Sequence, residues 1–165
     1  LEFLNNFKKI ENDFKCIFIG GPSGKYGNEY LQELKQTVKD FNLEENIEFL
    51  DNLPQIKIIE LLNKAKLLIH TSEFETFGLV AIEANTMGVP VLTTNNGSLM
   101  ELIENNRNGY LSNDLVDRNV NRFVKNLLND NKKFKEISLD CLRISKDYDW
   151  KATTSNLNKL YEGLI

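Results

Sequence analysis

Short, mostly apolar runs alternate with amphipathic stretches along most of this chain, and the alternation limits the folds open to it. Each run is short enough to form one strand, and the runs lie at residues 16–19, 47–50, 67–70, 91–93 and 110–111. Helical spacing of apolar residues is found near 1–10, 31–41, 58–62, 79–86 and 99–103, and from about residue 115 onward. Strands that are apolar throughout are typical of parallel sheets covered on both faces. We therefore predict an α/β fold with a doubly wound, Rossmann-like parallel sheet.

Length and composition favour a single domain over residues 1–165. The chain has 165 residues, of which 41% are hydrophobic, and this is enough to build one sizeable core. It contains no repeat and no linker-like segment. Near the C-terminus, Leu157, Leu160 and Leu164 recur at near-helical spacing, and we expect them to lie in the core.

Charge and cysteine content argue against several classes of protein. The net charge of -4 and the pI near 5.2 give no positive field that would attract nucleic acid. Cys16 and Cys141 stand far apart without metal-ligand spacing, which favours a reduced, cytoplasmic setting. No apolar run is long enough to span a membrane, and the first residues do not resemble a signal peptide.

The most informative segment, residues 72–84, leads from the end of a predicted strand into a predicted helix. Parallel sheets of this type bind ligands beyond the carboxyl ends of their strands, so this loop is a candidate site. We expect the N–H groups of Phe77, Gly78 and Leu79 to be free at the helix start and to bind a diphosphate. Glu75, in the loop, would face a sugar, and Glu83, about one turn inside the helix, would bind ribose hydroxyls.

Glu75-x7-Glu83, with Phe77-Gly78-Leu79 between, resembles the signature of retaining glycosyltransferases of the GT-B fold, the group 1 family. The resemblance is to the C-terminal, donor-binding domain of that fold and covers residues 14–165. Further motifs match in the same order along the chain: Gly20-Gly21-Pro22-Ser23-Gly24, Gly88-Val89-Pro90-Val91, Asn96-Gly97-Ser98, Glu101-Leu102-Ile103, Asn108-Gly109-Tyr110-Leu111, Asp149-Trp150 and Leu160-Tyr161. The last two resemble the family's closing helix, which crosses back to the other domain.

The resemblance implies a function for each part of the motif. The residue at the position of Glu75, the candidate catalytic residue, binds hydroxyls of the donor sugar, and the one at Glu83 holds the ribose. The resemblance also implies retaining transfer of a hexosyl group from a UDP- or GDP-type donor to a glycan, lipid or small acceptor, with neither cofactor nor divalent metal. Thr76 stands where the family often has glycine, and Ser98 and Met100 depart from its common Gly-Gly-x-Pro run. The predicted donor-binding residues are listed together here: Glu83, Phe77, Gly78, Leu79, Gly20, Gly21 and Thr76.

In the family, a strand and a loop bearing an Arg and a Lys precede the part that this chain resembles, and an acceptor-binding domain precedes both. That strand is normally central, so its absence would open a gap in the sheet or be filled by another chain. Without the two cations the leaving group loses electrostatic support, so we expect weak donor binding and no transfer by this chain alone. The full enzyme is expected in the cytoplasm, with peripheral association at the inner face of a membrane as an option.

Other interpretations of these residues stay open. Taken singly, Glu75 is an ordinary solvated loop carboxylate, and Glu83 is a favourable charge in the N-terminal half of a helix. His70, the only histidine, is expected to pack or hydrogen-bond near the site, and Glu101 either contacts nucleotide or caps a helix. Asp147-Tyr148-Asp149 is interpreted as a solvated pair and not as a metal site. A nucleotide-sugar epimerase of the same fold and a non-catalytic, flavodoxin-like binding module are the alternative functions.

Overall fold

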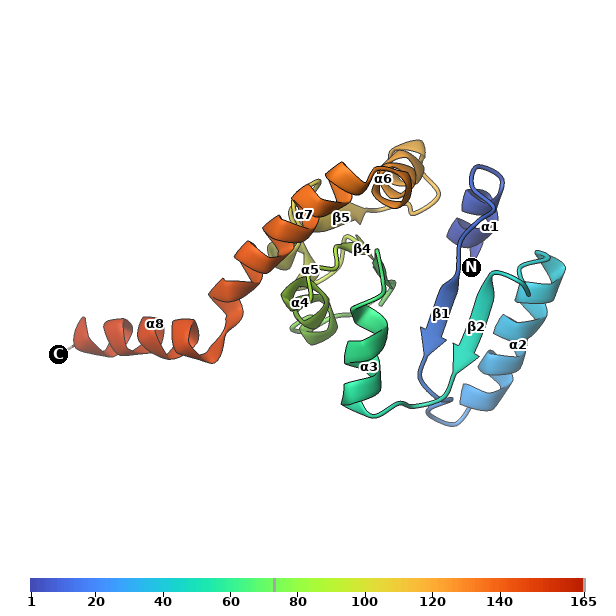
Figure 1. Ribbon diagram of the computed structural model, residues 1–165. Helices are drawn as coiled ribbons and strands as arrows, with labels where there is room; N and C mark the ends of the chain where they lie inside the picture. The colour runs from blue at the N-terminus through green and yellow to red at the C-terminus, as the bar shows by residue number, and fades with distance from the viewer. Residues whose placement is uncertain (73, 165) are drawn as a thin grey trace. The chain divides into compact units, whose positions relative to one another are not determined.

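The computed structural model describes residues 1–72 and 74–164 (Figure 1). Glu73, inside the 72–84 segment, and Ile165 lie outside the described residues. All five predicted apolar runs form strands, and helices separate them. The elements are α1 (Glu2–Lys8), β1 (Cys16–Ile19), α2 (Gly27–Asp40), β2 (Ile47–Leu50), α3 (Gln55–Leu62), β3 (Leu68–His70), α4 (Leu79–Thr86), β4 (Val91–Thr94), α5 (Leu99–Leu102), β5 (Gly109–Ser112), α6 (Arg118–Asn129), α7 (Asn131–Ile144), the 3₁₀ helix η1 (Ser145–Tyr148) and α8 (Trp150–Glu162). The predicted α/β class with parallel strands is confirmed.

The chain forms two compact units, Leu1–Ile58 and Ile59–Ile165. Its strands form two sheets, β1-β2 and β3-β4-β5, and no pairing between these sheets is recorded for residues 1–72 and 74–164. Each unit is described by itself below. The assignment of residues 1–165 to one domain that lacks a central strand stays a prediction.

The first unit is built on the parallel pair β1 and β2, joined by α2. The register runs from Cys16 opposite Ile47 to Ile19 opposite Leu50. The buried apolar side chains of this unit come from α1, α2, β2 and the turn before β2: Phe3, Leu4, Phe7, Val38, Leu43 and Ile47. Apolar burial thus holds these elements together.

The second unit contains the parallel sheet β3-β4-β5. Because all three strands run the same way, the ends of β3, β4 and β5, at His70, Thr94 and Ser112, lie at one edge of the sheet. Helix α4 packs against β3, β4, α5 and α7. Its buried face belongs to one apolar cluster, whose fully or nearly buried members are Ala81, Ala84, Val89, Val91, Leu99, Leu102 and Ile103. This cluster fixes where α4 begins relative to the strand ends.

No residue of the C-terminal helix α8 is buried, and the expectation that the leucines in and just after this helix lie in the core was wrong. Leu157, Leu160 and Leu164 are all exposed, Leu160 to 65%. Helix α8 follows η1 and projects from the rest of the second unit (Figure 1). Its apolar side chains therefore have no cover within the described part of the chain.

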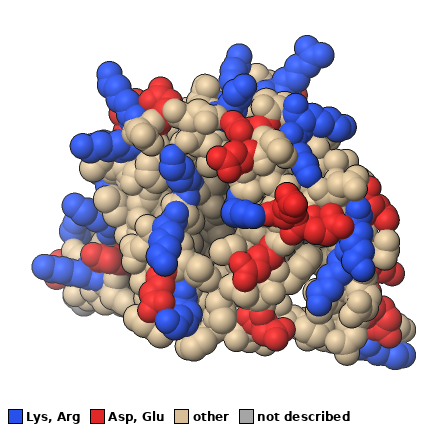
Figure 2. All heavy atoms as spheres, turned by 45° about the vertical axis from the view of Figure 1, so that its right-hand side comes forward, with Lys and Arg blue, Asp and Glu red and all other residues tan. Residues whose placement is uncertain are grey.

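The surface carries both signs of charge. On the face shown in Figure 2, Lys and Arg side chains are interspersed with Asp and Glu side chains. No helix among the described residues is both long enough and apolar enough to cross a lipid bilayer.

Two buried asparagines link α4 to the segment before β5. Asn108 is completely buried, and its Nδ2 donates to Asn85 Oδ1 and to the Leu102 carbonyl, both at 2.8 Å. Its Oδ1 accepts the Glu104 N–H at 2.7 Å. Asn85 Nδ2 in turn donates to the carbonyls of Val89 at 3.0 Å and Asn108 at 3.2 Å. This network satisfies buried polar groups that would otherwise destabilise the fold.

Replacing Asn108 by Ala should lower the free energy of unfolding by about 3 kcal/mol. The substitution leaves three groups without their Asn108 partner: the side-chain Oδ1 of Asn85, the backbone carbonyl of Leu102 and the Glu104 N–H. Urea unfolding followed by circular dichroism measures the change. The matched control is Asn113→Ala on the exposed loop after β5, which should stay within about 0.5 kcal/mol of the parent. Equal effects at the two positions would contradict the importance of the network.

Candidate functional site

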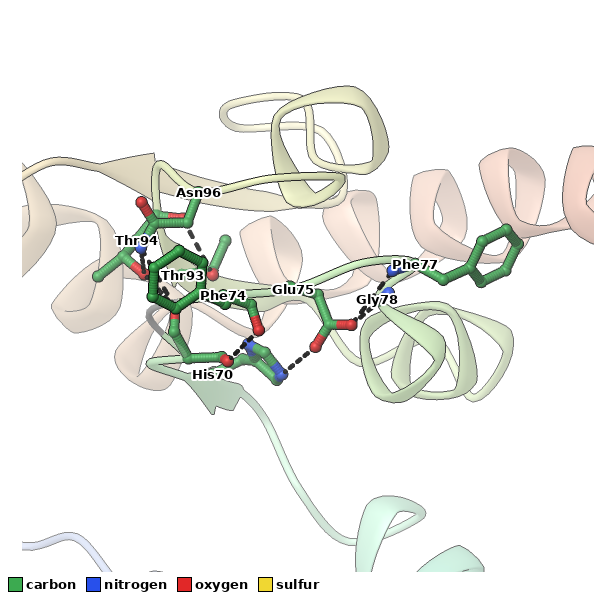
Figure 3. Close-up of polar contacts among 9 residues, drawn as sticks. His70, Phe74, Glu75, Phe77, Gly78, Thr93, Thr94 and Asn96 are labelled. Atoms are coloured by element: carbon green, nitrogen blue, oxygen red, sulfur yellow. Dashed lines mark hydrogen bonds and ion pairs between the residues drawn. The ribbon is translucent and has the colours of Figure 1, made fainter.

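The candidate site lies where β3 and β4 end and where a loop, described for residues 71–72 and 74–78, leads into α4. Two side chains at the end of β4 bind this loop: Thr94 Oγ1 and Asn96 Nδ2 donate to the Ser72 carbonyl at 3.3 and 3.2 Å. Farther along, the Ser98 N–H donates to the Glu75 carbonyl at 3.3 Å. The loop is therefore held against the turn that follows β4 (Figure 3).

The side chain of Glu75 is the centre of the polar contacts in this loop (Figure 3). Its Oε1 accepts the N–H groups of Gly78 at 2.9 Å and Phe77 at 3.2 Å. Its Oε2 lies 3.3 Å from His70 Nε2, and the side chains of Glu75 and His70 are 22% and 14% exposed. His70 thus contacts Glu75, in agreement with the hydrogen-bonding role expected for it.

These contacts stabilise the ionised carboxylate. The Gly78 N–H, followed by the Phe77 N–H, holds the pKa of Glu75 below its ordinary value of 4.5, and His70 acts in the same direction. Partial desolvation of the carboxylate opposes this shift without reversing it. Glu75 is therefore an anion at neutral pH.

One expectation about the helix start needs correction. We expected the N–H groups of Phe77 and Gly78 to be free, but both donate to Glu75 in the structure, and α4 begins only at Leu79. The reason is local. Glu75 lies two residues before Phe77 and three before Gly78, so its carboxylate can reach both N–H groups and cap them. Within the described part of the chain, the N–H groups of Leu79 and Val80 have no hydrogen-bond partner.

Gly78 has two structural reasons to be glycine. Its φ of +80° is in the left-handed region, and a Cβ there would lie 2.6 Å from Leu102 Cδ1. Glycine thus turns the chain into α4 while the α5 side chains pack closely against the turn. Thr76 and Phe77, just before it, are exposed. Glu83, the fifth residue of α4, is also exposed, and its place one turn inside the helix is as predicted.

The predicted pair Gly20 and Gly21 belongs to the first unit. The Gly20 N–H donates to the Leu50 carbonyl at 3.1 Å, and the Gly21 N–H donates to Asn52 Oδ1 at 3.1 Å. Gly20 has a φ of +132°. The two glycines thus form the turn after β1, and their role in donor binding stays a prediction.

The remaining candidates differ in where they lie. Glu101 is exposed on α5. Asp149 caps α8, because its Oδ1 accepts the Ala152 N–H at 2.6 Å. No group of three His, Cys, Asp or Glu side chains within residues 1–72 and 74–164 is placed to hold a metal ion. Metal independence stays a prediction.

A family model for the group 1 glycosyl transferases matches residues 1–138. The chain belongs to this family. A relative in Dictyostelium discoideum, alpha-1,3/1,6-mannosyltransferase ALG2, is 32% identical over 159 residues, which cover 94% of this chain and 38% of the relative.

Two solved structures resemble this chain along most of its length. Anabaena Alr3699/HepE in complex with UDP is 25% identical, with a TM-score of 0.80 over 99% of this chain and 44% of HepE. The C-terminal domain of LpcC, a group 1 family protein of Francisella tularensis, is 23% identical and has a TM-score of 0.76 over 90% of this chain and 77% of that domain. The second likeness concerns the fold alone. The chain spans less than half the length of ALG2 and HepE.

The turn after β4 supports Glu75 in a way that the sequence pattern does not show. Gly97 has a φ of +53°, and a Cβ there would lie 2.1 Å from the Glu75 carbonyl oxygen. Asn96 ties the same turn to Ser72. The available signal was the Asn-Gly dipeptide, which is typical of a tight turn but does not say what the turn contacts.

Replacing Gly97 by Ala should displace the Glu75 backbone. The new methyl group would clash with backbone atoms of Glu75, which cannot move aside as a flexible side chain could. We expect the free energy of unfolding to fall by about 2 kcal/mol. Gly24→Ala is the control, since Gly24 also has positive φ, +72°, but open space around its Cβ. Urea unfolding of both variants measures the difference, and a Gly97 variant no less stable than the Gly24 variant would contradict the close packing.

The capping contact of Glu75 also predicts a pH dependence. Since the pKa of Glu75 is lower in the folded chain than its ordinary value of 4.5, the unfolded chain binds a proton at higher pH than the folded chain. The stability from this contact is therefore complete above about pH 4.5 and is lost as the pH falls through the lower, folded pKa. Urea unfolding of the parent and of Glu75→Gln should differ most at neutral pH and converge in acid. A difference that does not change with pH would contradict this account.

Proposed function

We propose that this glycosyl transferase binds a nucleoside-diphosphate sugar of the UDP or GDP type at the start of α4 and transfers its hexosyl group with retention of configuration. The acceptor is a glycan, a lipid or a small molecule. The observation that carries the proposal is the pair of unpartnered N–H groups, on Leu79 and Val80, at a helix start that lies between two glutamates, Glu75 and Glu83. Helix starts of this kind favour phosphate groups through their N–H donors and their dipole.

Each part of the site has a proposed role. The backbone at Phe77, Gly78 and Leu79 binds the diphosphate, and Glu83 accepts hydrogen bonds from the ribose hydroxyls. Glu75 binds hydroxyls of the transferred sugar, next to the bond that breaks. Thr76, Gly20 and Gly21 are proposed as further donor-binding positions. No cofactor or divalent metal takes part in this proposal, and Leu79 and the helix dipole contribute to stabilising the departing diphosphate.

The family match and the HepE complex support this proposal. HepE is similar over nearly the whole chain, and its structure contains UDP. The matched family consists of glycosyl transferases, so we prefer transfer to the epimerase and to the non-catalytic module.

Glu83→Ala should weaken binding of the matching nucleoside diphosphate by about 10-fold or more, since it removes charged hydrogen bonds worth roughly 1.5–3 kcal/mol. Isothermal titration calorimetry with UDP and with GDP, on the parent and the variant, measures this. The matched control is Glu136→Ala, which removes an exposed glutamate from α7. The proposed donor site would be overturned if neither nucleotide binds, or if the Glu83→Ala variant binds nucleotide as tightly as the parent.

A further inference from the structure

The Glu75 carboxylate lies where an incoming anion would bind. Its Oε1 accepts two N–H groups, those of Phe77 and Gly78, and both are donors that the proposed function assigns to a diphosphate. In the structure an anion therefore already occupies this part of the site, and that anion belongs to the protein itself (Figure 3).

We propose that Glu75 is a built-in competitor of the donor diphosphate, so that its carboxylate has to leave the Phe77 and Gly78 N–H groups before a donor binds fully. This inference rests on the proposed function and concerns the regulation of the same site. It gives Glu75 two consecutive tasks, closing the empty site and then binding the sugar.

Glu75 and a diphosphate would compete for two reasons: both are negatively charged, and both need the same N–H donors. Each N–H group makes one strong hydrogen bond, so it cannot serve Glu75 and a phosphate oxygen equally well. A carboxylate and a diphosphate at hydrogen-bonding distance from the same two donors also repel each other strongly in a partly desolvated site. Among the described residues at this helix start, the N–H groups of Leu79 and Val80 are the ones left to donate to a phosphate while Glu75 stays in place.

The contacts of Glu75 are suited to a carboxylate that moves. Its side chain is 22% exposed, so part of it already contacts solvent. Gly78 and Phe77 keep its pKa low, so it remains an anion and an effective competitor at neutral pH. His70 Nε2, 3.3 Å from Oε2, provides a second contact that holds the closed arrangement.

Two unsatisfied polar atoms near Glu75 indicate that the closed arrangement does not satisfy every group in the site. His70 Nδ1 and Ser98 Oγ are two of the three buried side-chain polar atoms for which the described part of the chain offers no hydrogen-bond partner. His70 contacts the Glu75 side chain, and the Ser98 N–H binds the Glu75 backbone. Buried groups without partners are rare and tend to mark functional sites. A second arrangement of this loop would give them a chance to pair.

The competition has a clear consequence for binding. A protein whose competent state is a fraction of its population binds more weakly by that fraction. Removing the competitor should therefore strengthen binding of a diphosphate that has no sugar, even though it removes a residue of the proposed sugar site. A residue that only contacts sugar would leave such binding unchanged, and a residue that only stabilises the helix would weaken it when lost.

Isothermal titration calorimetry with inorganic pyrophosphate and with UDP or GDP tests the proposal on this chain. Glu75→Ala and Glu75→Gln should each bind these ligands about 5-fold more tightly than the parent, or better, while Glu136→Ala should bind them as the parent does. Glu75→Gln keeps the shape and an acceptor oxygen, so it remains informative if the alanine variant is unstable by circular dichroism. Unchanged or weaker binding by the folded Glu75 variants would overturn the proposal, as would a lack of pyrophosphate binding by every variant.

A second measurement follows the carboxylate itself. NMR titration of the ¹³C-labelled Glu75 carboxyl, with and without saturating pyrophosphate, should show its pKa rising when the anion takes over the N–H groups. An unchanged pKa at saturation would refute displacement. The Glu83→Ala variant separates the two proposals: if nucleotide binding depends on Glu83 but does not increase in the Glu75 variants, the donor site stands and only the competition fails.

Discussion

The bonds from the Phe77 and Gly78 N–H groups to the Glu75 carboxylate close the loop between β3 and α4 on itself. The loop is held in position from two neighbouring strands. His70, at the end of β3, contacts the Glu75 side chain, and the turn at Gly97, after β4, packs against the Glu75 backbone. The apolar cluster under α4 fixes the helix start, and the loop conformation then follows from it. Burial therefore decides where the site lies, and a few polar contacts decide its shape.

Most of the fold was predictable because it depends on where apolar residues recur. The runs at 16–19 and 47–50 became β1 and β2 with the predicted bounds, because short, mostly apolar runs between helical patterns are typical of strands in a parallel sheet. The place of Glu75 in a loop and of Glu83 inside α4 was predictable for a similar reason, because Gly78 separates a strand end from a helical pattern.

The features that could not be predicted are those in which a side chain has several possible hydrogen-bonding or packing partners. Spacing places Glu75 near the Phe77 and Gly78 N–H groups, but the same spacing allows the carboxylate to point into solvent or towards a ligand. The difference between these rotamers is small on the scale of single hydrogen bonds. The α8 leucines illustrate a related limit, since helical spacing defines an apolar face and contains no information about what covers it.

A site that binds anions has to remain stable when it is empty, and the arrangement around Glu75 meets this requirement with the protein's own carboxylate. Unpaired N–H groups at a helix start are destabilising where water reaches them poorly, so capping them stabilises the fold. The cap then opposes the ligand with the same charge and the same hydrogen-bonding pattern. In the proposed function, affinity for the donor and stability of the loop are thus opposed through one side chain. A glutamate three residues before Gly78 serves both needs only if it changes partners, and its side chain beside His70 is only partly buried.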